Sequence, residues 1–415
     1  MKTSNKKKIA IVGLGYVGLA LLAEAVKTEN SIVGFDVSEK RTEELRKRKD
    51  TRGEFEPKDL AQINCATISS NPTCLDGVDI FIVTVPTPIR ENKETNLDFV
   101  YSAIDTISPF IRRGSIIVFE STVSPGCTMN ECVPRIAQNT GLQLNIDFAV
   151  GFSPERVVPG KGNVSIKEVV KLVSASVDWG LSAISQFYSS IIPAGIYECK
   201  SIEIAEASKL IENIQRDVNI ALMNEVSCLL RAMDIPTLDV IDAASTKWNF
   251  ARYEPGLVGG HCIAVDPYYL IEIGDKYGLP LELCKQARQI NDNVRDIVFQ
   301  KLLKTSGKVL CLGITFKENC SDVRQSLAMD IVNELRKNGK DLAIFDPHFR
   351  ELNTITLEDI FKQNWDCICI FVKHNEFVQL DINKLRKIIK VGGSLYDIKG
   401  IFRTSSLGPT EYWTL

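Results

Sequence analysis

The chain has 415 residues, of which 45% are hydrophobic and 24% are charged. These fractions match ordinary soluble globular proteins and exclude disordered and fibrous architectures. The length exceeds what one compact core usually organises, so two or three domains are expected. The formal net charge is −3, with 49 basic and 52 acidic residues, and it gives no electrostatic footprint for nucleic acid or an anionic membrane.

The amino-terminal segment places lysines before an apolar run, an order that signal peptides also have. This run contains three glycines and lacks a small-residue cleavage site, so we interpret it as the first strand of a cytoplasmic domain. Nowhere do about 18 uncharged apolar residues follow one another, and no membrane-spanning helix is expected. A soluble cytoplasmic protein is predicted.

Short β-rich apolar runs recur through the first half of the chain. They are KIAIVGLGYVG, IVGFDV, DIFIVTVP, SIIVFES and a strand near FAVGFS. Helical patterns fill the intervals between them, and this alternation predicts a parallel sheet with helices on both faces. We place this α/β domain at residues 1–195.

The first strand of this domain leads into the glycine turn GLGYVG, and a helix is predicted to begin near Tyr16. The first glycine permits the tight turn, the second lets the backbone approach a pyrophosphate, and the third allows close helix packing. The pattern predicts dinucleotide binding, with tight strand-to-helix packing as the alternative. The predicted cofactor residues here are Gly13, Gly15, Tyr16, Val17 and Gly18.

Two charged residues follow the second predicted strand. Asp36 closes that strand, where a carboxylate can bind the adenosine ribose hydroxyls and would repel a 2′-phosphate, so NAD is favoured over NADP. Arg41 either reaches the adenosine side of the cofactor or is a solvated charge on the second helix.

A long central helix is predicted over residues 201–233, because this stretch contains neither proline nor glycine and its apolar residues recur at helical spacing. Lys209, Asn213 and Arg216 share a face of this helix, which also carries Glu206. Such a face either binds a ligand or is a solvated charge stripe, and the spacing does not decide between the two.

The stretch PGLVGGHCIAVDPYYL has no clear period. Its glycines leave room for a ligand, and Cys262 follows His261 and precedes Asp266, an arrangement that suits a nucleophile with a lowered pKa. The alternative is a buried thiol in a strained loop. The chain has twelve cysteines in all, and core packing in a reducing compartment explains most of them.

Strand signals return from about residue 305. They are KVLCLGI, DLAIFDP, CICIFV and SLYDI, and helical runs such as SLAMDIVNELRKNG separate them. They predict a second α/β sheet. This half shares the pattern of the first half but lacks its glycine fingerprint.

Several motifs follow one another in the order GLGYVG, ESTVSPG, GFSPERVVPG, KLIENIQRDVNIA, PGLVGGHC, VDPYYL and LGITFKEN. Together they resemble the UDP-glucose/UDP-mannose dehydrogenase family from about residue 8 to 400. The resemblance implies two Rossmann-like doubly wound parallel-sheet domains joined by a long central helix. It divides the chain into an NAD-binding domain (1–195), a helical dimerisation segment with the cysteine loop (196–300) and a UDP-sugar-binding domain (301–415).

The resemblance also implies a reaction in which two NAD molecules remove four electrons from a primary alcohol, through an enzyme-bound aldehyde and a cysteine thioester. Cys262 then captures the aldehyde as nucleophile. Lys209 and Asn213 stabilise the developing oxyanion, and Asp266 orients or deprotonates through water. A homodimer or higher homo-oligomer is expected, with neither a metal nor a nucleic-acid or membrane partner.

Further residues are assigned by the same resemblance. Thr122 holds a water near the hydride-transfer site, and Glu155 activates water against the thioester. Without the resemblance, Thr122 caps the helix that follows and Glu155 is a turn residue. The remaining cofactor contacts are Thr87 and Arg324, and the substrate contacts, besides Glu155, Lys209 and Asn213, are Arg156, Arg216, Tyr253, Gly259, Lys317 and Lys399.

The loop sequences indicate the substrate. Cys262 is followed by IAVDP where the glucose-oxidising branch has proline, lysine and aspartate, and Pro159 stands where that branch has a second glutamate. The stretch STKWNFARYEPGLVGGHC resembles enzymes that make UDP-N-acetylglucosaminuronate or its galacto epimer. We therefore expect a UDP-N-acetyl-D-glucosamine 6-dehydrogenase that supplies capsule or O-antigen synthesis. Alternatives are the UDP-N-acetylmannosamine, UDP-N-acetylgalactosamine and UDP-glucose enzymes, a two-electron hydroxyacid dehydrogenase and a non-catalytic sensor.

Overall fold

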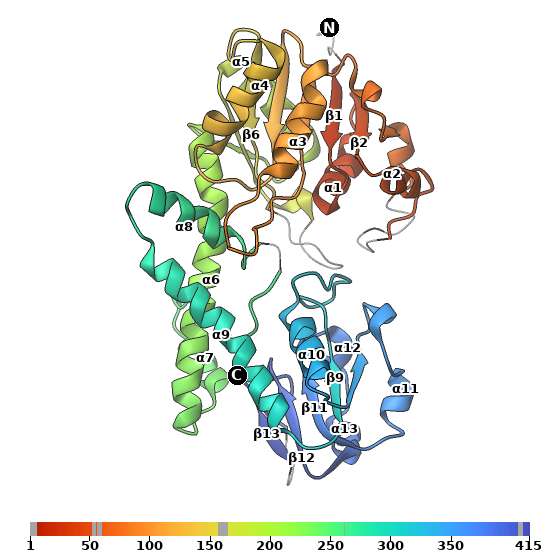
Figure 1. Ribbon diagram of the computed structural model, residues 1–415, viewed down its shortest axis with the longest axis vertical. Helices are drawn as coiled ribbons and strands as arrows, with labels where there is room; N and C mark the ends of the chain where they lie inside the picture. Colours follow the sequence, from red (N-terminus) through yellow and green to blue (C-terminus); the bar gives the residue numbers. More distant parts are fainter. Residues whose placement is uncertain (1–5, 52–54, 56–59, 157–164, 261, 406–409) are drawn as a thin grey trace. The chain divides into compact units, whose positions relative to one another are not determined.

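The computed structural model describes residues 6–51, 55, 60–156, 165–260, 262–405 and 410–415 (Figure 1). The chain forms two compact units. The first contains Met1–Glu212 and Tyr268–Pro280, and the second contains Asn213–Pro267 and Leu281–Leu415. Each unit has its own sheet and its own cores, and each is described by itself.

The sheet of the first unit has eight strands in the order β3-β2-β1-β4-β5-β6-β7-β8. The strands are β1 (Lys8–Val12), β2 (Ser31–Phe35), β3 (Thr67–Ser69), β4 (Ile80–Val83), β5 (Ser115–Phe119), β6 (Phe148–Phe152), β7 (Lys171–Ala175) and β8 (Ile196–Glu198). All neighbours are parallel except β6 and β7, which pair antiparallel. The strand order reverses at β1, and in such sheets ligands bind beyond the carboxyl ends of the strands at this point.

Two cores lie on opposite faces of this sheet because successive strand residues point to opposite sides. Ala10 and Val12 of β1 join one core, which contains side chains of α3 (Asp98–Ile107) and α4 (Val133–Thr140). The other core contains Ile9 and Ile11, and it is covered by side chains of three helices. These are α1 (Tyr16–Ala25), α2 (Glu39–Arg46) and α5 (Asp178–Ile191). The near-continuous apolar runs of the sequence therefore reflect strands that are covered on both faces.

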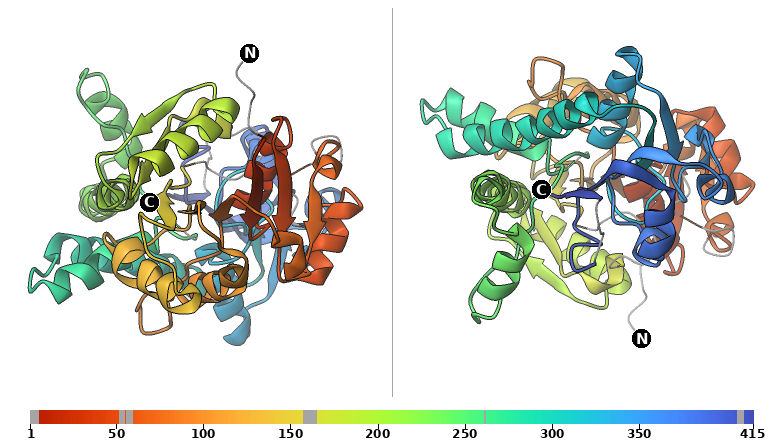
Figure 2. Two further views of the ribbon diagram at one scale, coloured as in Figure 1. Left: turned by 90° about the horizontal axis from the view of Figure 1, so that it is seen from above. Right: turned by 90° about the horizontal axis from the view of Figure 1, so that it is seen from below.

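The long helix α6 (Ile202–Ala232) has 31 residues and lies within a residue or two of the predicted bounds. It runs vertically in Figure 1, and Figure 2 views it almost along its axis. It ends just before Asp234, whose φ of +57° does not continue a helix, and Pro236 follows. The next helices are α7 (Thr237–Ala244), α8 (Asp266–Lys276) and α9 (Glu282–Lys304).

The second unit contains a parallel five-stranded sheet in the order β10-β9-β11-β12-β13. The strands are β9 (Val309–Leu312), β10 (Leu342–Phe345), β11 (Trp365–Ile370), β12 (Ile389–Asp397) and β13 (Glu411–Trp413). Side chains of α9 and α10 (Leu327–Lys337) cover one face. The other face packs against α11 (Leu357–Ile360), α12 (Asn375–Val378) and α13 (Ile382–Ile388).

The predicted fold class is confirmed: two doubly wound α/β sheets and a long central helix. Short elements complete the chain, namely 3-10 turns at Ile63–Cys65, Pro72–Leu75, Ser108–Phe110, Ile166–Glu168 and Arg350–Leu352 and a π-helical turn at Thr128–Cys132. Among the described residues, no helix is long and apolar enough to cross a membrane. The division at residues 195 and 300 stays a prediction.

Candidate active site

The glycine turn between β1 and α1 has the geometry of a phosphate cradle. Gly13 has a φ of +97°, which favours glycine, and Gly15 is the residue before the first turn of α1. A methyl group on Gly18 would collide with the carbonyl of Gly13, which also accepts a 2.6 Å hydrogen bond from Thr84 Oγ1. Tyr16 and Val17 begin the helix, so its first backbone N–H groups point toward the turn. The turn therefore fits a dinucleotide pyrophosphate.

Asp36 and Arg41 both contact this turn. Asp36 follows β2 and accepts hydrogen bonds from the N–H groups of Leu14 (2.8 Å) and Ser38 (2.9 Å). Arg41 is only 5% exposed, so it is no solvated charge. Its Nε donates to the Leu14 carbonyl at 2.9 Å, and its Nη1 donates to Asp50 at 2.7 Å. The two side chains fix the position of Leu14 between the glycines.

Thr87, Thr122 and Glu155 follow three adjacent strands of the first sheet, β4, β5 and β6. The Thr87 carbonyl accepts a 3.0 Å hydrogen bond from Tyr269. Thr122 is half-buried, and the turn at Thr128–Cys132 begins after Cys127 with no side-chain cap, so the capping alternative for Thr122 does not hold. Glu155 is buried, unlike the surface turn residue of the alternative.

Arg156 follows Glu155 and forms a two-pronged ion pair with Glu212 of α6. Its Nε and Nη2 lie 3.1 and 2.6 Å from the two carboxylate oxygens, and its Nη1 donates to the Val170 carbonyl at 2.8 Å. The next residues, including Pro159, lie outside the described part of the chain. The pair ties the segment after β6 to the central helix within the first unit.

A buried polar network that sequence reasoning missed lies behind Glu155. Lys171 Nζ is 3.0 Å from Glu120 Oε2 and donates to the Pro154 carbonyl at 3.1 Å. Tyr188 donates its hydroxyl to Glu120. Burial raises the pKa of the Glu120 carboxyl although the Lys171 ammonium opposes this shift. The network fixes the turn directly before Glu155.

The polar face of α6 is buried, so the solvated-stripe alternative does not hold. Glu206, Lys209, Asn213 and Asp217 are at most 9% exposed, whereas Arg216 is exposed. The buried face thus includes Asp217 but not Arg216. Glu206, Asn213 and Asp217 each bond a specific partner within their own unit.

Glu206 binds the segment that follows Thr122. Its two oxygens accept hydrogen bonds from the N–H groups of Gly126 (2.6 Å) and Thr128 (2.9 Å). Burial raises the pKa of Glu206 to about 7. Farther along α6, Asp217 forms a buried ion pair with Arg288 of α9 at 2.5 Å. These contacts anchor the helix on both sides of Lys209 and Asn213.

Cys262 lies in a turn that leads into α8. Its carbonyl accepts hydrogen bonds from the N–H groups of Val265 (3.0 Å) and Asp266 (2.8 Å). Asp266 is the first residue of α8 and is 2% exposed, and its Oδ2 accepts a 2.5 Å hydrogen bond from Asn213. The second unit therefore brings Cys262, Asp266 and Asn213 together. His261 lies outside the described residues.

The glycine loop before Cys262 is held by Asn224 of α6, which bonds both the N–H (2.8 Å) and the carbonyl (3.1 Å) of Gly256. If Gly256 carried a side chain, its Cβ would lie only 2.5 Å from Lys399 Nζ. At Gly259 a Cβ would lie 2.6 Å from the Gln325 carbonyl. Tyr253 is half-buried at the start of this loop. Lys399 is thus close to the loop, and its contact with the sugar nucleotide stays a prediction.

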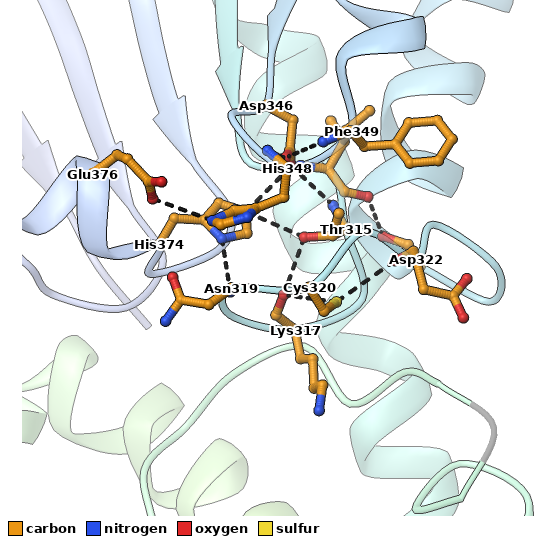
Figure 3. A network of polar contacts seen from close by, with 12 residues as sticks. Thr315, Lys317, Asn319, Cys320, Asp322, Asp346, His348, Phe349, His374 and Glu376 are labelled. Atoms are coloured by element: carbon orange, nitrogen blue, oxygen red, sulfur yellow. Dashed lines mark hydrogen bonds and ion pairs between the residues drawn. The ribbon is translucent and has the colours of Figure 1, made fainter. Parts of the chain in front are cut away.

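Lys317 lies in the loop after β9, and the loop is part of a polar network in the second unit (Figure 3). The network centres on Asp346, after β10, and His374, after β11, both missed by sequence reasoning. The signal was available, because each follows a predicted strand, as Asp36 does. Arg324 is exposed and bonds Asp322 at 2.6 Å. No cluster of three metal-ligating side chains occurs in the described ranges.

Family models match three consecutive parts of the chain. They are the NAD binding domain of the UDP-glucose/GDP-mannose dehydrogenase family at residues 7–187, the central domain at 203–293 and the UDP binding domain at 310–404. The matches follow one another in the order of the two sheets and the helical region between them.

Individual proteins resemble the chain along almost its whole length. The UDP-N-acetyl-D-glucosamine 6-dehydrogenase of Salmonella typhi is 40% identical over 410 residues, 95% of this chain and 96% of the relative. The enzyme of the same name from Pseudomonas aeruginosa is 38% identical over 413 residues, 94% and 96% of the two chains. A solved structure of a UDP-D-ManNAc dehydrogenase from Pyrococcus horikoshii gives a TM-score of 0.88 at 27% identity and covers 98% of both chains.

Proposed function

Because the chain belongs to the UDP-glucose/GDP-mannose dehydrogenase family, we propose that it is a UDP-N-acetyl-D-glucosamine 6-dehydrogenase, which oxidises the C6 alcohol of the sugar to a carboxylate. The observation that carries this proposal is the arrangement of Cys262 beside a buried Asp266 that is bonded to Asn213. A plain hydroxyacid dehydrogenase needs no cysteine in such a loop. The relatives at 40% and 38% identity support the choice of sugar.

The cofactor is NAD, in keeping with the matched NAD binding domain. When bound, NAD accepts one hydride in each of the two oxidation steps. The turn at Gly13 fits the pyrophosphate, because Gly13 has a positive φ and the first N–H groups of α1 point toward the turn. In our proposal Asp36 binds the adenosine ribose, and Arg41 and Thr87 are further cofactor contacts from the first unit.

The chemistry proposed for Cys262 has three steps. Its thiolate forms a C–S bond to the C6 aldehyde, and the aldehyde oxygen takes up a proton, which gives a thiohemiacetal. Loss of a hydride and a proton converts the thiohemiacetal into a thioester. Water then adds to the thioester carbon, the C–S bond breaks, and the thiolate leaves while the product becomes a carboxylate. The covalent link retains the intermediate between the two oxidations.

Further side chains are proposed for the roles that these steps require. Lys209 and Asn213 donate to the oxygen on which negative charge develops, and the bond from Asn213 orients Asp266. Asp266 takes or returns protons through water. In the first unit, Thr122 holds a water near the site of hydride transfer, and Glu155 activates the hydrolytic water.

Binding of the UDP-sugar is proposed for a further set of residues. Lysine and arginine suit the diphosphate because they carry permanent positive charge at physiological pH. The set consists of Arg156, Arg216, Tyr253, Gly259, Lys317 and Lys399, with Arg324 on the cofactor side. We further propose that the enzyme is a cytoplasmic homodimer or larger oligomer and that its product supplies capsule or O-antigen synthesis.

The decisive experiment is the amount of NADH formed when a limiting UDP-sugar is turned over completely with excess NAD. We expect about two NADH per UDP-N-acetylglucosamine, since each of the two oxidations releases one hydride. Initial rates of NADH formation with UDP-N-acetylmannosamine, UDP-N-acetylgalactosamine and UDP-glucose rank the alternatives by kcat/KM. One NADH per sugar would contradict the thioester, and none with any UDP-sugar would favour the non-catalytic sensor.

A further inference from the structure

One imidazole ring holds both ends of the loop that carries Lys317. His374 Nε2 lies 3.1 Å from Thr315 Oγ1, and His374 Nδ1 accepts a 2.9 Å hydrogen bond from the N–H of Asn319. Lys317 lies midway between these two residues. In Figure 3 its side chain extends away from the network, whereas its carbonyl takes part in it. Thr315 Oγ1 donates to that carbonyl at 3.0 Å.

The hydrogen bonds define which ring nitrogen carries the proton. Nδ1 accepts from Asn319, so the proton of the neutral ring lies on Nε2. Nε2 can then donate to Asp346 Oδ2, which is 3.2 Å away, and to Thr315 Oγ1. Both nitrogens of a fully buried ring are thus used, one at each end of the loop.

The loop needs such support because its backbone is unusual. Asn319 has a φ of +54°, which non-glycine residues adopt infrequently, although asparagine tolerates it. Its side-chain oxygen accepts a 3.0 Å hydrogen bond from the N–H of Asn375, the residue after His374. The segment that begins α12 therefore bonds both the main chain and the side chain of Asn319.

Asp346 fixes the imidazole in turn. Its carboxylate is fully buried and accepts hydrogen bonds from the N–H groups of Ile314 (2.7 Å), His348 (2.8 Å) and Phe349 (3.0 Å). Burial alone would raise the pKa of this carboxyl, but the hydrogen bonds from His374 and the backbone lower it. A carboxylate with this many donors stays ionised and is a rigid acceptor for Nε2.

We propose that His374 is a positioning residue, which holds the 315–319 loop so that Lys317 is presented to the diphosphate of the UDP-sugar. The ligand in this statement rests on the proposed function, whereas the support of the loop by His374 does not. A ring that only filled the core would need no bond to either end of the loop. Here each ring nitrogen contacts a loop residue.

The test uses two substitutions that each keep one half of the ring's bonding. In His374→Asn the amide oxygen falls near the place of Nδ1 and can still accept from Asn319, while the partner of Thr315 is lost. In His374→Gln the amide nitrogen falls near the place of Nε2, and the Asn319 bond is lost. His348→Gln is the matched control, because this ring contacts His374 in a tilted arrangement, with 4.7 Å between the ring centroids, but bonds Glu376 and not the loop.

Two readouts are measured on the full-length protein. The first is hydrogen exchange of the backbone amides. We expect faster exchange confined to residues 315–322, with the Asn319 amide exposed in His374→Gln but protected in His374→Asn. The second is steady-state kinetics, in which either variant raises KM for UDP-N-acetylglucosamine about tenfold, the effect of one lost hydrogen bond, with little change in kcat or in KM for NAD.

Combination with Lys317→Met separates positioning from general packing. If His374 acts through Lys317, His374→Asn has no further effect on KM in the Lys317→Met background. Effects that multiply, or exchange that accelerates throughout the sheet of β9 to β13, would overturn the proposal. If the wild-type protein oxidises no UDP-sugar while the exchange result holds, the proposed function fails and the role of His374 in holding the loop stands.

Discussion

At the scale of single residues, hydrogen bonds between distant parts of the chain build both candidate sites. The glycine turn and Asp36 follow directly from strands that the apolar pattern reveals. The hydrogen bond between Asn213 and Asp266 joins residues 53 positions apart, so spacing could not predict it. The same holds for the bond between Asp346 and His374, although each residue follows a predicted strand.

Replacing Cys262 tests the covalent step. We expect Cys262→Ala to yield at most one NADH per UDP-N-acetylglucosamine and to lose steady-state turnover, because no thiohemiacetal can form for the second oxidation. The measurement is NADH absorbance after complete reaction of limiting sugar. Cys228→Ala, an exposed cysteine of α6, is the control and should retain about two NADH per sugar. Two NADH per sugar from Cys262→Ala would exclude the thioester.

The buried pair of Lys171 and Glu120 predicts a large effect on stability. Lys171→Met leaves the Glu120 carboxylate buried without its cation, so the free energy of unfolding should fall by about 3–5 kcal/mol in urea titrations. Lys167→Met is the control. The Lys167 side chain is 40% exposed and pairs with Glu24, and because exposed pairs contribute only about 0–1 kcal/mol, its loss should lower the free energy of unfolding by no more than that. If both variants lost the same free energy of unfolding, the buried pair would contribute no more to stability than the exposed pair.

At the scale of elements, the long strands and α6 could be predicted because their periodicity is strong and α6 contains no breaker. The strands β8 and β13 have three residues each, too few for a period to appear. The burial of the polar face of α6 could not be predicted, for a different reason. Charged residues at helical spacing look alike whether they are solvated or buried, and only the packing of distant segments makes Glu206 and Asp217 inaccessible.

Glu206 gives this helix a pH-dependent contribution to stability. Its pKa is raised to about 7 in the fold by burial, so between pH 4.5 and 7 the folded state binds its proton more tightly than the unfolded state does. Stability should therefore fall as the pH rises through this window. A shift of this size corresponds to at most about 3 kcal/mol.

Glu206→Gln should reduce this slope, since glutamine carries no titratable proton. The measurement is the urea unfolding free energy of wild type and variant at pH 5 and pH 7.5. The control is Glu203→Gln, an exposed neighbour on the same helix, which should follow the wild-type slope closely. An unchanged slope in Glu206→Gln would show that the carboxyl is not protonated in the folded state near pH 5.

At the scale of the whole molecule, the same backbone arrangement occurs in both units. Gly13 and Gly313 both follow a first strand with positive φ. The N–H of Leu14 donates to Asp36 at 2.8 Å, and the N–H of Ile314 donates to Asp346 at 2.7 Å. The sequence showed the alternation of strands and helices in both halves but not this repeat, because the second half lacks the later glycines.

The repeat has different consequences in the two units. In the first unit, the side chain next to the turn is Arg41, which bonds the Leu14 carbonyl. In the second unit, the aspartate also bonds His374 and so fixes the loop of Lys317. The same backbone arrangement thus fits a dinucleotide in one unit and, in our proposal, presents a lysine to a UDP-sugar in the other.

The exposed face of α6 predicts the oligomeric state. Leu222 and Leu229 are 49% and 61% exposed and are seven residues apart, so they lie on one side of the helix, and Met233, directly after its last residue, is 57% exposed. Apolar side chains in such a row are typical of a surface that another chain covers. We expect a second copy of this chain, because a homodimer is the commonest soluble assembly and its interface uses the same face twice.

Leu229→Glu should therefore convert the dimer into a monomer, since a carboxylate would be buried from each copy at the shared interface. Sedimentation velocity at micromolar concentrations measures the mass directly. Leu357→Glu, at a 44% exposed leucine in α11, adds the same charge elsewhere and should leave the dimer intact. A monomeric wild type would refute the homodimer, and a dimer that survives Leu229→Glu would place the interface on another surface.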